Sequence, residues 1–223
     1  MRLPSREMHC HLLPGVDDGF RNADDSLEAI RQLSSYGVRD IVFTPHLNPD
    51  VYHSVDESFI RSRYDSFMAS FPRDIDVKIS LAAEYMIVKD FELRAEDPSL
   101  LTFEDGSILI EMSYYYPSPN LEQTVFELNM AGLNPILAHP ERYLYMASHL
   151  KDFEKLADMG CRFQLNLLSL AGTYGSDSVK IAKFLLENKL YSFAATDLHS
   201  LHQLEMIVDS EPVRKLKKLL FQY

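Results

Sequence analysis

Residues 8–19 read MHCHLLPGVDDG, in which two histidines one residue apart are followed by an Asp-Asp-Gly turn. In an extended strand, side chains two residues apart point to the same face, so His9 and His11 are expected to lie side by side. Asp18 follows in the adjoining loop, close enough in sequence to fold back toward them. Such a pattern suits a metal site, but it also suits two half-buried, hydrogen-bonded histidines. The rest of the chain has to decide between these interpretations.

The 223 residues have an ordinary globular composition, with 46% hydrophobic and 25% charged residues. Length and composition predict a single domain over residues 1–223. The net charge of −11 argues against binding to nucleic acid or to anionic lipid. No apolar run is long enough to insert in a membrane, and the N-terminus lacks the apolar core of a signal peptide. Two cysteines, Cys10 and Cys161, suggest no disulfide framework, so we expect a cytoplasmic location.

Short apolar segments alternate with amphipathic segments about seven times along the chain. After a first strand around His9, the pattern predicts strands over 40–44, 77–83, 107–112, 134–138, 162–167 and 190–196. Helices are expected around 27–33, 59–68, 122–131, 150–159, 179–187 and 212–220. This alternation indicates βαβ units and a parallel sheet. A length of roughly 30 residues per unit favours a closed or nearly closed α/β barrel over an open sheet.

Side chains that can bind metal recur at the carboxyl ends of these strands. They are His9, His11, His46, Glu84, Glu111, His139, Asp197 and His199. In a parallel barrel these ends converge on one mouth. Singly, each has a structural explanation: Glu84 could cap a helix, Glu111 could pair with an arginine, and His139 could be a satisfied core histidine. Together they predict a cluster of divalent cations, because burying the two glutamates without partners would be very costly.

Carboxylates and imidazoles in one cluster suit Mn, Zn or Fe ions lying close together. Such ions lower the pKa of a bound water and bind the oxygens of a phosphate ester, which predicts phosphoester hydrolysis. Arg142, three residues after His139, is the expected extra cation for the phosphoryl group, with a surface ion pair to Glu141 as the alternative. A cysteine-dependent phosphatase is not expected, because the positions six residues after the two cysteines are Val16 and Leu167 rather than arginine.

Seven motifs of this chain resemble those of the PHP (polymerase and histidinol phosphatase) superfamily, and more closely its capsule-type bacterial tyrosine-protein phosphatase branch. They are MHCHLLPGVDDG at 8–19, TPH at 44–46, AE at 83–84, LIE at 109–111, AHPER at 138–142, QLNLLSLAG at 164–172 and ATDLH at 195–199. They follow in family order from Met8 to His199. The resemblance implies a distorted (β/α)7 barrel of the PHP type and three divalent metal ions, usually described as Mn, with Fe and Zn as alternatives.

The resemblance also assigns roles to individual residues. The first ion would be held by His9, His11, Glu84 and Asp197. The second would be held by Glu84, Glu111 and His139, and the third by Asp18, His46 and His199. Arg142 falls on a phosphate-binding arginine. The implied substrate is phosphotyrosine on a bacterial tyrosine autokinase that controls capsule or exopolysaccharide export, hydrolysed by a metal-activated hydroxide.

Two positions depart from the family pattern. Glu7 stands where the family commonly has Asp, which keeps the charge but lengthens the side chain that supports the first histidine. After His199 the family usually carries a phosphate-binding arginine, whereas here His202 is the nearest equivalent. A histidine offers less charge and no bidentate fork, so we expect weaker phosphate binding. His199 and His202 are both candidates to assist the departing tyrosyl oxygen.

Two alternative functions stay open on this sequence. A PHP phosphoesterase acting on a small phosphate monoester, such as histidinol phosphate, would share the metals and differ at the pocket rim, for which residues 48–53 and 114–116 are candidates. A metal-binding but weakly catalytic scaffold that binds the kinase belongs to another class, and negligible turnover despite bound metal would identify it. The sequence also leaves open whether the chain forms oligomers.

Overall fold

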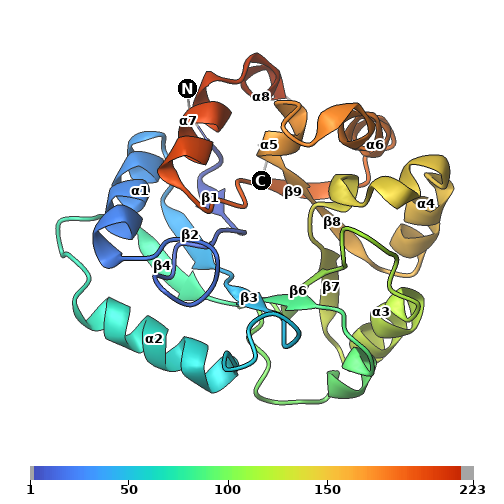
Figure 1. Cartoon of the computed structure of the whole chain (residues 1–223), viewed down its shortest axis with the longest axis horizontal. Coiled ribbons are helices and arrows are strands. Elements are labelled where there is room, and N and C mark those ends of the chain that lie inside the picture. Colours follow the sequence, from blue (N-terminus) through green and yellow to red (C-terminus); the bar gives the residue numbers. More distant parts are fainter. Residues whose placement is uncertain (1–2, 217–223) are drawn as a thin grey trace.

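All strands in the described part of the chain, residues 3–216 of a computed structural model, are paired in parallel (Figure 1). A three-stranded sheet has the order β1 (Arg6–Glu7), β2 (Asp40–Phe43), β4 (Lys78–Leu81). A six-stranded sheet has the order β3 (His46–Leu47), β5 (Glu84–Met86), β6 (Ser107–Glu111), β7 (Asn134–Leu137), β8 (Arg162–Asn166), β9 (Tyr191–Ala195). The predicted α/β architecture with parallel strands is therefore confirmed.

The strands predicted over 40–44 and 77–83 are observed as β2 and β4, and each is followed by a short strand of the other sheet, β3 or β5, that the sequence pattern missed. Pro45 lies between β2 and β3, where it separates the two strands because proline has no N–H to donate to a strand ladder. Ala82 and Ala83 separate β4 from β5. Backbone hydrogen bonds still join the pieces: Ala82 N–H donates to the Phe43 carbonyl over 2.8 Å, and Glu84 N–H donates to the Pro45 carbonyl over 3.0 Å. The nine strands thus occupy seven positions around the sheet.

The first and last strands meet beyond their carboxyl ends. The strand predicted around His9 ends earlier, at Glu7, and the chain continues to an isolated parallel bridge between Cys10 and Leu198. His11 N–H donates to the Leu198 carbonyl over 3.0 Å, and Asp197 N–H donates to the His9 carbonyl over 2.8 Å. These contacts complete a distorted (β/α)7 barrel in which the segment that carries the two histidines lies beside the segment that carries Asp197.

Helices lie around the outside of this ring (Figure 1). The α-helices are α1 (Ala23–Ser35), α2 (Glu57–Ala69), α3 (Leu121–Met130), α4 (Lys151–Asp158), α5 (Leu167–Leu170), α6 (Gly175–Glu187), α7 (Leu201–Asp209) and α8 (Glu211–Lys215). Three 3-10 helices are η1 (Phe91–Arg94), η2 (Pro140–Arg142) and η3 (Leu144–Ser148). The sequence pattern missed α5 and α7. Of the helix predicted over 212–220, residues 217–220 lie outside the described part.

β6 lies in the interior of the molecule. Every residue of β6 is buried, as expected for a parallel strand covered on both sides. Phe153 of α4 packs edge to face on Phe163 of β8, with ring centroids 5.8 Å apart. Within this interior, the carboxylate of Glu141 accepts hydrogen bonds from the Asn166 N–H over 2.8 Å and from the Tyr191 hydroxyl over 2.7 Å. Glu141 therefore ties η2 to β8 and β9.

Replacing Tyr191 by Phe is expected to reduce the free energy of unfolding by about 1–3 kcal/mol, because the buried Glu141 carboxylate loses one of its two donors. Urea titration followed by circular dichroism measures the change. Tyr115→Phe is the matched control, since the Tyr115 side chain is 90% exposed and its loss of a hydroxyl should change stability by less than about 0.5 kcal/mol. Equal stability of the two variants would contradict the assignment of Glu141 as a structural anchor.

Candidate metal centre

Most of the ionisable side chains predicted at the strand ends meet in three groups that share members. In each group the candidate ligand atoms lie within 4.8 Å of one another. The groups are His9, His11, Glu84 and Asp197; His46, Glu84 and Glu111; and His11, Asp18, His46 and His199. Because neighbouring groups share His11, His46 or Glu84, the three form one continuous cluster at the mouth of the barrel.

All four residues of the first group are buried, and Asp197 alone among them reaches the cavity described below. Glu84 Oε2 lies 3.2 Å from His9 Nε2, and Asp197 Oδ1 lies 3.2 Å from His11 Nε2. Neither of these two oxygens receives a hydrogen bond from the described residues. A buried carboxylate oxygen without a donor is costly, and a cation removes that cost. The donor set of two imidazoles and two carboxylates therefore fits a divalent transition metal ion.

The second group differs from the set that the family resemblance implied. His46 Nδ1 lies 2.9 Å from Glu111 Oε1 and 3.0 Å from Glu84 Oε2. His139, expected with these two glutamates, instead places its Nε2 2.9 Å from the other Glu84 oxygen and 3.4 Å from the Tyr114 hydroxyl. His139 therefore lies in contact with Glu84, and its role as a metal ligand stays a prediction. In the described structure, however, His46 completes the group of three.

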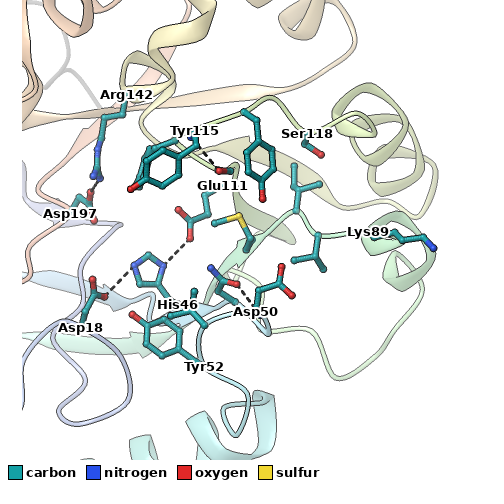
Figure 2. A pocket seen from close by; sticks show the side chains of 18 of the residues that line it. Asp18, His46, Asp50, Tyr52, Lys89, Glu111, Tyr115, Ser118, Arg142 and Asp197 are labelled. Atoms are coloured by element: carbon teal, nitrogen blue, oxygen red, sulfur yellow. Dashed lines mark hydrogen bonds and ion pairs between the residues drawn. The ribbon is translucent and has the colours of Figure 1, made fainter.

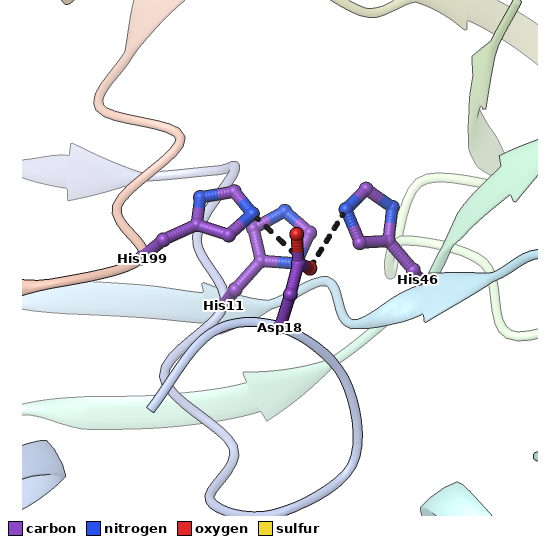
Figure 3. A group of neighbouring side chains, drawn as sticks. All are labelled: His11, Asp18, His46 and His199. Atoms are coloured by element: carbon purple, nitrogen blue, oxygen red, sulfur yellow. Dashed lines mark ion pairs between the residues drawn. The ribbon is translucent and has the colours of Figure 1, made fainter. Parts of the chain in front are cut away.

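The third group lies nearer to solvent (Figure 3). Asp18, whose side chain is 62% exposed, holds Oδ1 3.5 Å from His46 Nε2 and 3.7 Å from His199 Nε2. Burial and the neighbouring His11 lower the pKa of His199 to about 4, so this imidazole is neutral at pH 7, the form that binds metal. His199 Nδ1 donates to the Asp197 carbonyl over 2.8 Å, which leaves Nε2 facing Asp18.

A second layer of polar side chains orients the imidazoles. Asp17 lies 2.8 Å from His11 Nδ1, and its oxygens accept from the N–H groups of Gly19 and His46, each over 3.0 Å. Burial alone would raise the pKa of Asp17, but the charge and hydrogen bond of His11 bring it to about 2. Gln164 Oε1 lies 2.9 Å from His9 Nδ1. Both contacts leave Nε2 of each histidine directed at the centre.

Sequence reasoning gave Asp17 and Gln164 no role, although each carried a signal. Asp17 shares the Asp-Asp pair with Asp18, and Gln164 is a polar residue at a strand end, like the candidate ligands. Glu7 was recognised as a supporting residue. It is buried and accepts from the N–H groups of His9 over 2.9 Å and of Thr196 over 3.1 Å. Burial raises its pKa to about 7, and the longer side chain still joins the two ends of the ring.

Backbone conformation at two candidate residues is unusual. His139 has φ 32° and ψ 55°, and Asp197 has φ 50°. Such left-handed conformations are uncommon for side chains other than glycine, asparagine and aspartate, and they concentrate at functional sites. Each residue lies two positions after the end of a strand, His139 after β7 and Asp197 after β9, at the mouth of the barrel. This backbone conformation directs both side chains toward Glu84 and the first group.

The cluster opens into a cavity with a volume of about 800 Å³ (Figure 2). Five candidate ligands lie at its inner end: Asp18, His46, Glu111, Asp197 and His199. The predicted rim loops are confirmed as walls, with Asn48, Asp50, Val51 and Tyr52 on one side and Tyr114, Tyr115 and Tyr116 on the other. Met86, Ile87 and Val88 add an apolar surface. The cavity thus joins a polar inner end to largely aromatic and apolar walls.

Arg142 lies at the wall of this cavity, as predicted for a phosphate-binding cation. Its Nη1 donates to Asp197 Oδ2 over 3.0 Å (Figure 2). The alternative, a surface ion pair with Glu141, is wrong, because Glu141 is buried and turned toward Asn166 and Tyr191. Arg142 is therefore fixed beside a candidate metal ligand rather than on the outer surface.

His202 does not join the cluster. The structure places it on α7, where its side chain is 78% exposed and lies 3.5 Å from Glu205. The helix begins at Leu201, so successive residues point in different directions, and Gln203 rather than His202 lines the cavity. Gln203 Oε1 accepts from the His199 N–H over 2.7 Å. The expectation that His202 assists the departing oxygen has no support in this position, whereas Gln203 holds His199 in place.

Comparison with known proteins identifies relatives over almost the whole chain. The profile of the family described as "Capsular polysaccharide synthesis, CpsB/CapC" matches residues 5–208. Tyrosine-protein phosphatase YwqE of Bacillus subtilis (strain 168) is 31% identical over 196 residues, which cover 87% of this chain and 77% of that protein. Tyrosine-protein phosphatase CpsB of Streptococcus pneumoniae is 26% identical over 201 residues, covering 87% and 83%.

A solved structure has the same fold over nearly its full length. It comes from a crystallographic study of YwqE from Bacillus subtilis and CpsB from Streptococcus pneumoniae, described there as metal-dependent tyrosine phosphatases. The TM-score is 0.80 at 28% identity, with 97% of this chain and 94% of that chain covered. A lactonase from Listeria monocytogenes, with a TM-score of 0.53 and 11% identity, shares the fold alone. No helix among residues 3–216 has the length and apolar character to cross a membrane.

Asp17→Asn is expected to weaken Mn²⁺ binding about 10- to 100-fold, because the amide accepts the Nδ1 proton of His11 less strongly and fixes the orientation of the ring less firmly. Isothermal titration calorimetry with Mn²⁺ measures the affinity. Asp24→Asn, an exposed change of the same chemistry in the first turn of α1, is the control and should bind like the wild type. Unchanged affinity of Asp17→Asn would show that Asp17 does not orient a ligand.

Proposed function

The chain belongs to the CpsB/CapC family of capsular polysaccharide synthesis, and from this premise we propose that it hydrolyses phosphotyrosine in a protein substrate. The single observation that carries the proposal is that one cavity contains both a candidate metal cluster and an arginine beside it. Its inner end holds a cluster of carboxylates and imidazoles suited to divalent cations, and Arg142 lies beside them. The named relatives are tyrosine-protein phosphatases, which agrees with this reading of the site.

We assign three divalent ions to the three groups of side chains, with Mn as the first candidate and Fe or Zn as the others. His9, His11, Glu84 and Asp197 would hold one ion; His46, Glu84 and Glu111, with His139 beside them, a second; and His11, Asp18, His46 and His199 a third. When bound, such ions lower the pKa of a water molecule and neutralise charge on phosphate oxygens. The orphaned oxygens of Glu84 and Asp197 are the main support for this assignment.

The protein's own residues then orient the ester. Arg142 offers N–H groups to the phosphoryl oxygens, where its fixed charge favours the doubly charged phosphate. The walls made by Tyr52 and Tyr114 give an aromatic ring apolar surface to pack on. His199, neutral and hydrogen-bonded through Nδ1, is better suited to bind a cation than to donate a proton. Tyrosine is a good leaving group without such a proton, because its pKa is about 10.

A protein substrate fits the openness of the cavity. Its mouth is bordered by exposed aromatic side chains, Tyr115 and Tyr116, which are the residue type that protein interfaces favour. A bacterial tyrosine autokinase acting in capsule or exopolysaccharide synthesis is the partner that the family implies. A small phosphate monoester such as histidinol phosphate would leave much of the 800 Å³ unfilled.

Turnover of a phosphotyrosine peptide by Mn-loaded protein tests the proposal, with a phosphoserine peptide and histidinol phosphate assayed in parallel. We expect release of phosphate from phosphotyrosine in clear preference to the other two. Glu111→Gln should lower kcat/KM about tenfold or more, because it removes a charge from the second group. Preference for histidinol phosphate would move the enzyme to small-molecule substrates, and no turnover despite bound Mn would leave only a binding function.

Thiol chemistry is expected to play no part in the reaction. Cys10 is fully buried and its Sγ donates to the Val42 carbonyl, and burial raises the pKa of Cys161 to about 12. Neither side chain lines the cavity. Treatment of the native protein with iodoacetamide should therefore leave kcat/KM unchanged within about twofold, while a cysteine-dependent phosphatase treated alongside loses activity. Inactivation without unfolding, followed by circular dichroism, would refute the metal-based mechanism.

A further inference from the structure

We propose that Tyr174 is a positioning residue that holds the Arg142 guanidinium in place for a phosphoryl group, an inference that rests on the proposed function of the same cavity. Cζ of Arg142 lies 4.4 Å from the centre of the Tyr174 ring and 4.2 Å from the centre of the Tyr114 ring. Both distances are well inside the range of about 6 Å for cation–π attraction. Tyr174 and Arg142 both line the cavity.

The three side chains reach this point from different parts of the barrel. Arg142 ends η2 after β7, Tyr114 follows β6, and Tyr174 lies in the connection between α5 and α6. The backbone around Tyr174 turns through Gly172 and Gly175, whose φ angles of 83° and 88° are left-handed. Such angles suit glycine and strain other residues. The connection is therefore shaped to bring a half-buried ring against the guanidinium.

An aromatic ring has a specific advantage over a carboxylate as the neighbour of a phosphate-binding arginine. A guanidinium carries five N–H donors, and within the described residues Arg142 uses only one, in its bond to Asp197. Tyrosine rings attract the cation through their faces and take up none of the remaining donors. A second carboxylate would cancel the charge and occupy donors. The rings thus fix the side chain while leaving its N–H groups and its charge available.

This arrangement matters because few other cations line the cavity. Among residues 3–216, Lys89 is the other permanently charged cation in the wall, and it lies at the far end from Asp197 (Figure 2). His202 stands where related proteins usually carry a second phosphate-binding arginine, and its exposed side chain is directed away from the cavity. Among the described side chains, recognition of a phosphoryl group beside the candidate ligands therefore depends on the guanidinium of Arg142. Its orientation has to be maintained by neighbouring side chains.

Tyr174 offers a cleaner test than Tyr114. The Tyr114 hydroxyl lies 3.4 Å from His139 Nε2, so its replacement would disturb a candidate ligand as well. Tyr174→Leu removes the ring and keeps apolar bulk, whereas Tyr174→Phe keeps the ring face. Phe126→Leu on α3 is the control for an aromatic-to-leucine change, because Phe126 is 51% exposed and outside the cavity wall.

Each variant is loaded with Mn and compared with the wild type in two measurements. Calorimetry gives the affinity for inorganic phosphate, and steady-state kinetics give kcat and KM for the phosphotyrosine peptide. We expect Tyr174→Leu to weaken phosphate binding and raise KM about 3- to 10-fold, with Mn²⁺ affinity and melting temperature unchanged. Tyr174→Phe and Phe126→Leu should stay within about twofold of wild type. In an Arg142→Ala background, or Arg142→Lys if that variant unfolds, Tyr174→Leu should have no further effect.

Three results would overturn the inference: wild-type phosphate affinity in Tyr174→Leu, an equal loss in Tyr174→Phe, or the same loss when Arg142 is already replaced. Failure of wild-type protein to bind inorganic phosphate would overturn it as well. If the wild type does not cleave the peptide but phosphate binding falls as expected in Tyr174→Leu, the positioning role stands and the proposed substrate is wrong. The calorimetric arm therefore separates the two failures.

Discussion

The burial of the carboxylates of Glu84 and Asp197 at the mouth of the barrel is the constraint on which the rest of the site depends. Each keeps one oxygen without a hydrogen-bond donor from the described residues, beside the imidazoles of His9 and His11. A charged group in this position is stable only if a cation faces it. The polar side chains behind the imidazoles, above all Asp17, orient the rings so that their Nε2 lone pairs face the centre of the cluster.

This constraint also explains the irregular course of the barrel. Continuous strands would direct alternate side chains to the two faces of the sheet. Instead, the chain breaks at Pro45 before β3, turns through left-handed backbone at His139 and Asp197, and leaves regular pairing after Glu7. Each irregularity lies next to a candidate ligand. Regular strand pairing is thus interrupted where a candidate ligand has to point toward the cluster, as is common at functional sites.

The sequence carried the fold and the membership of the cluster, because both depend on periodic patterns. Short apolar segments that alternate with amphipathic segments indicated most of the strands and helices. Polar residues at the carboxyl ends of the strands indicated the site. It could not reveal that His46 would lie in one group with Glu84 and Glu111, since this depends on side-chain direction after a strand break. Nor could it show that α7 turns His202 outward, because one residue along a helix rotates a side chain by about 100°.

The way Arg142 is held gains importance because His202 stands where the family usually carries a second arginine. If the Arg142 side chain were free to move, it would lose conformational entropy each time a phosphate bound. Here Asp197 and two tyrosine rings restrict it beforehand, so that this cost is met on folding. The shared use of Asp197 has a further consequence: one oxygen faces the imidazoles and the other accepts from Arg142 and Asn166. The cation proposed to bind phosphate and the cluster proposed to bind metal are therefore joined by one carboxylate.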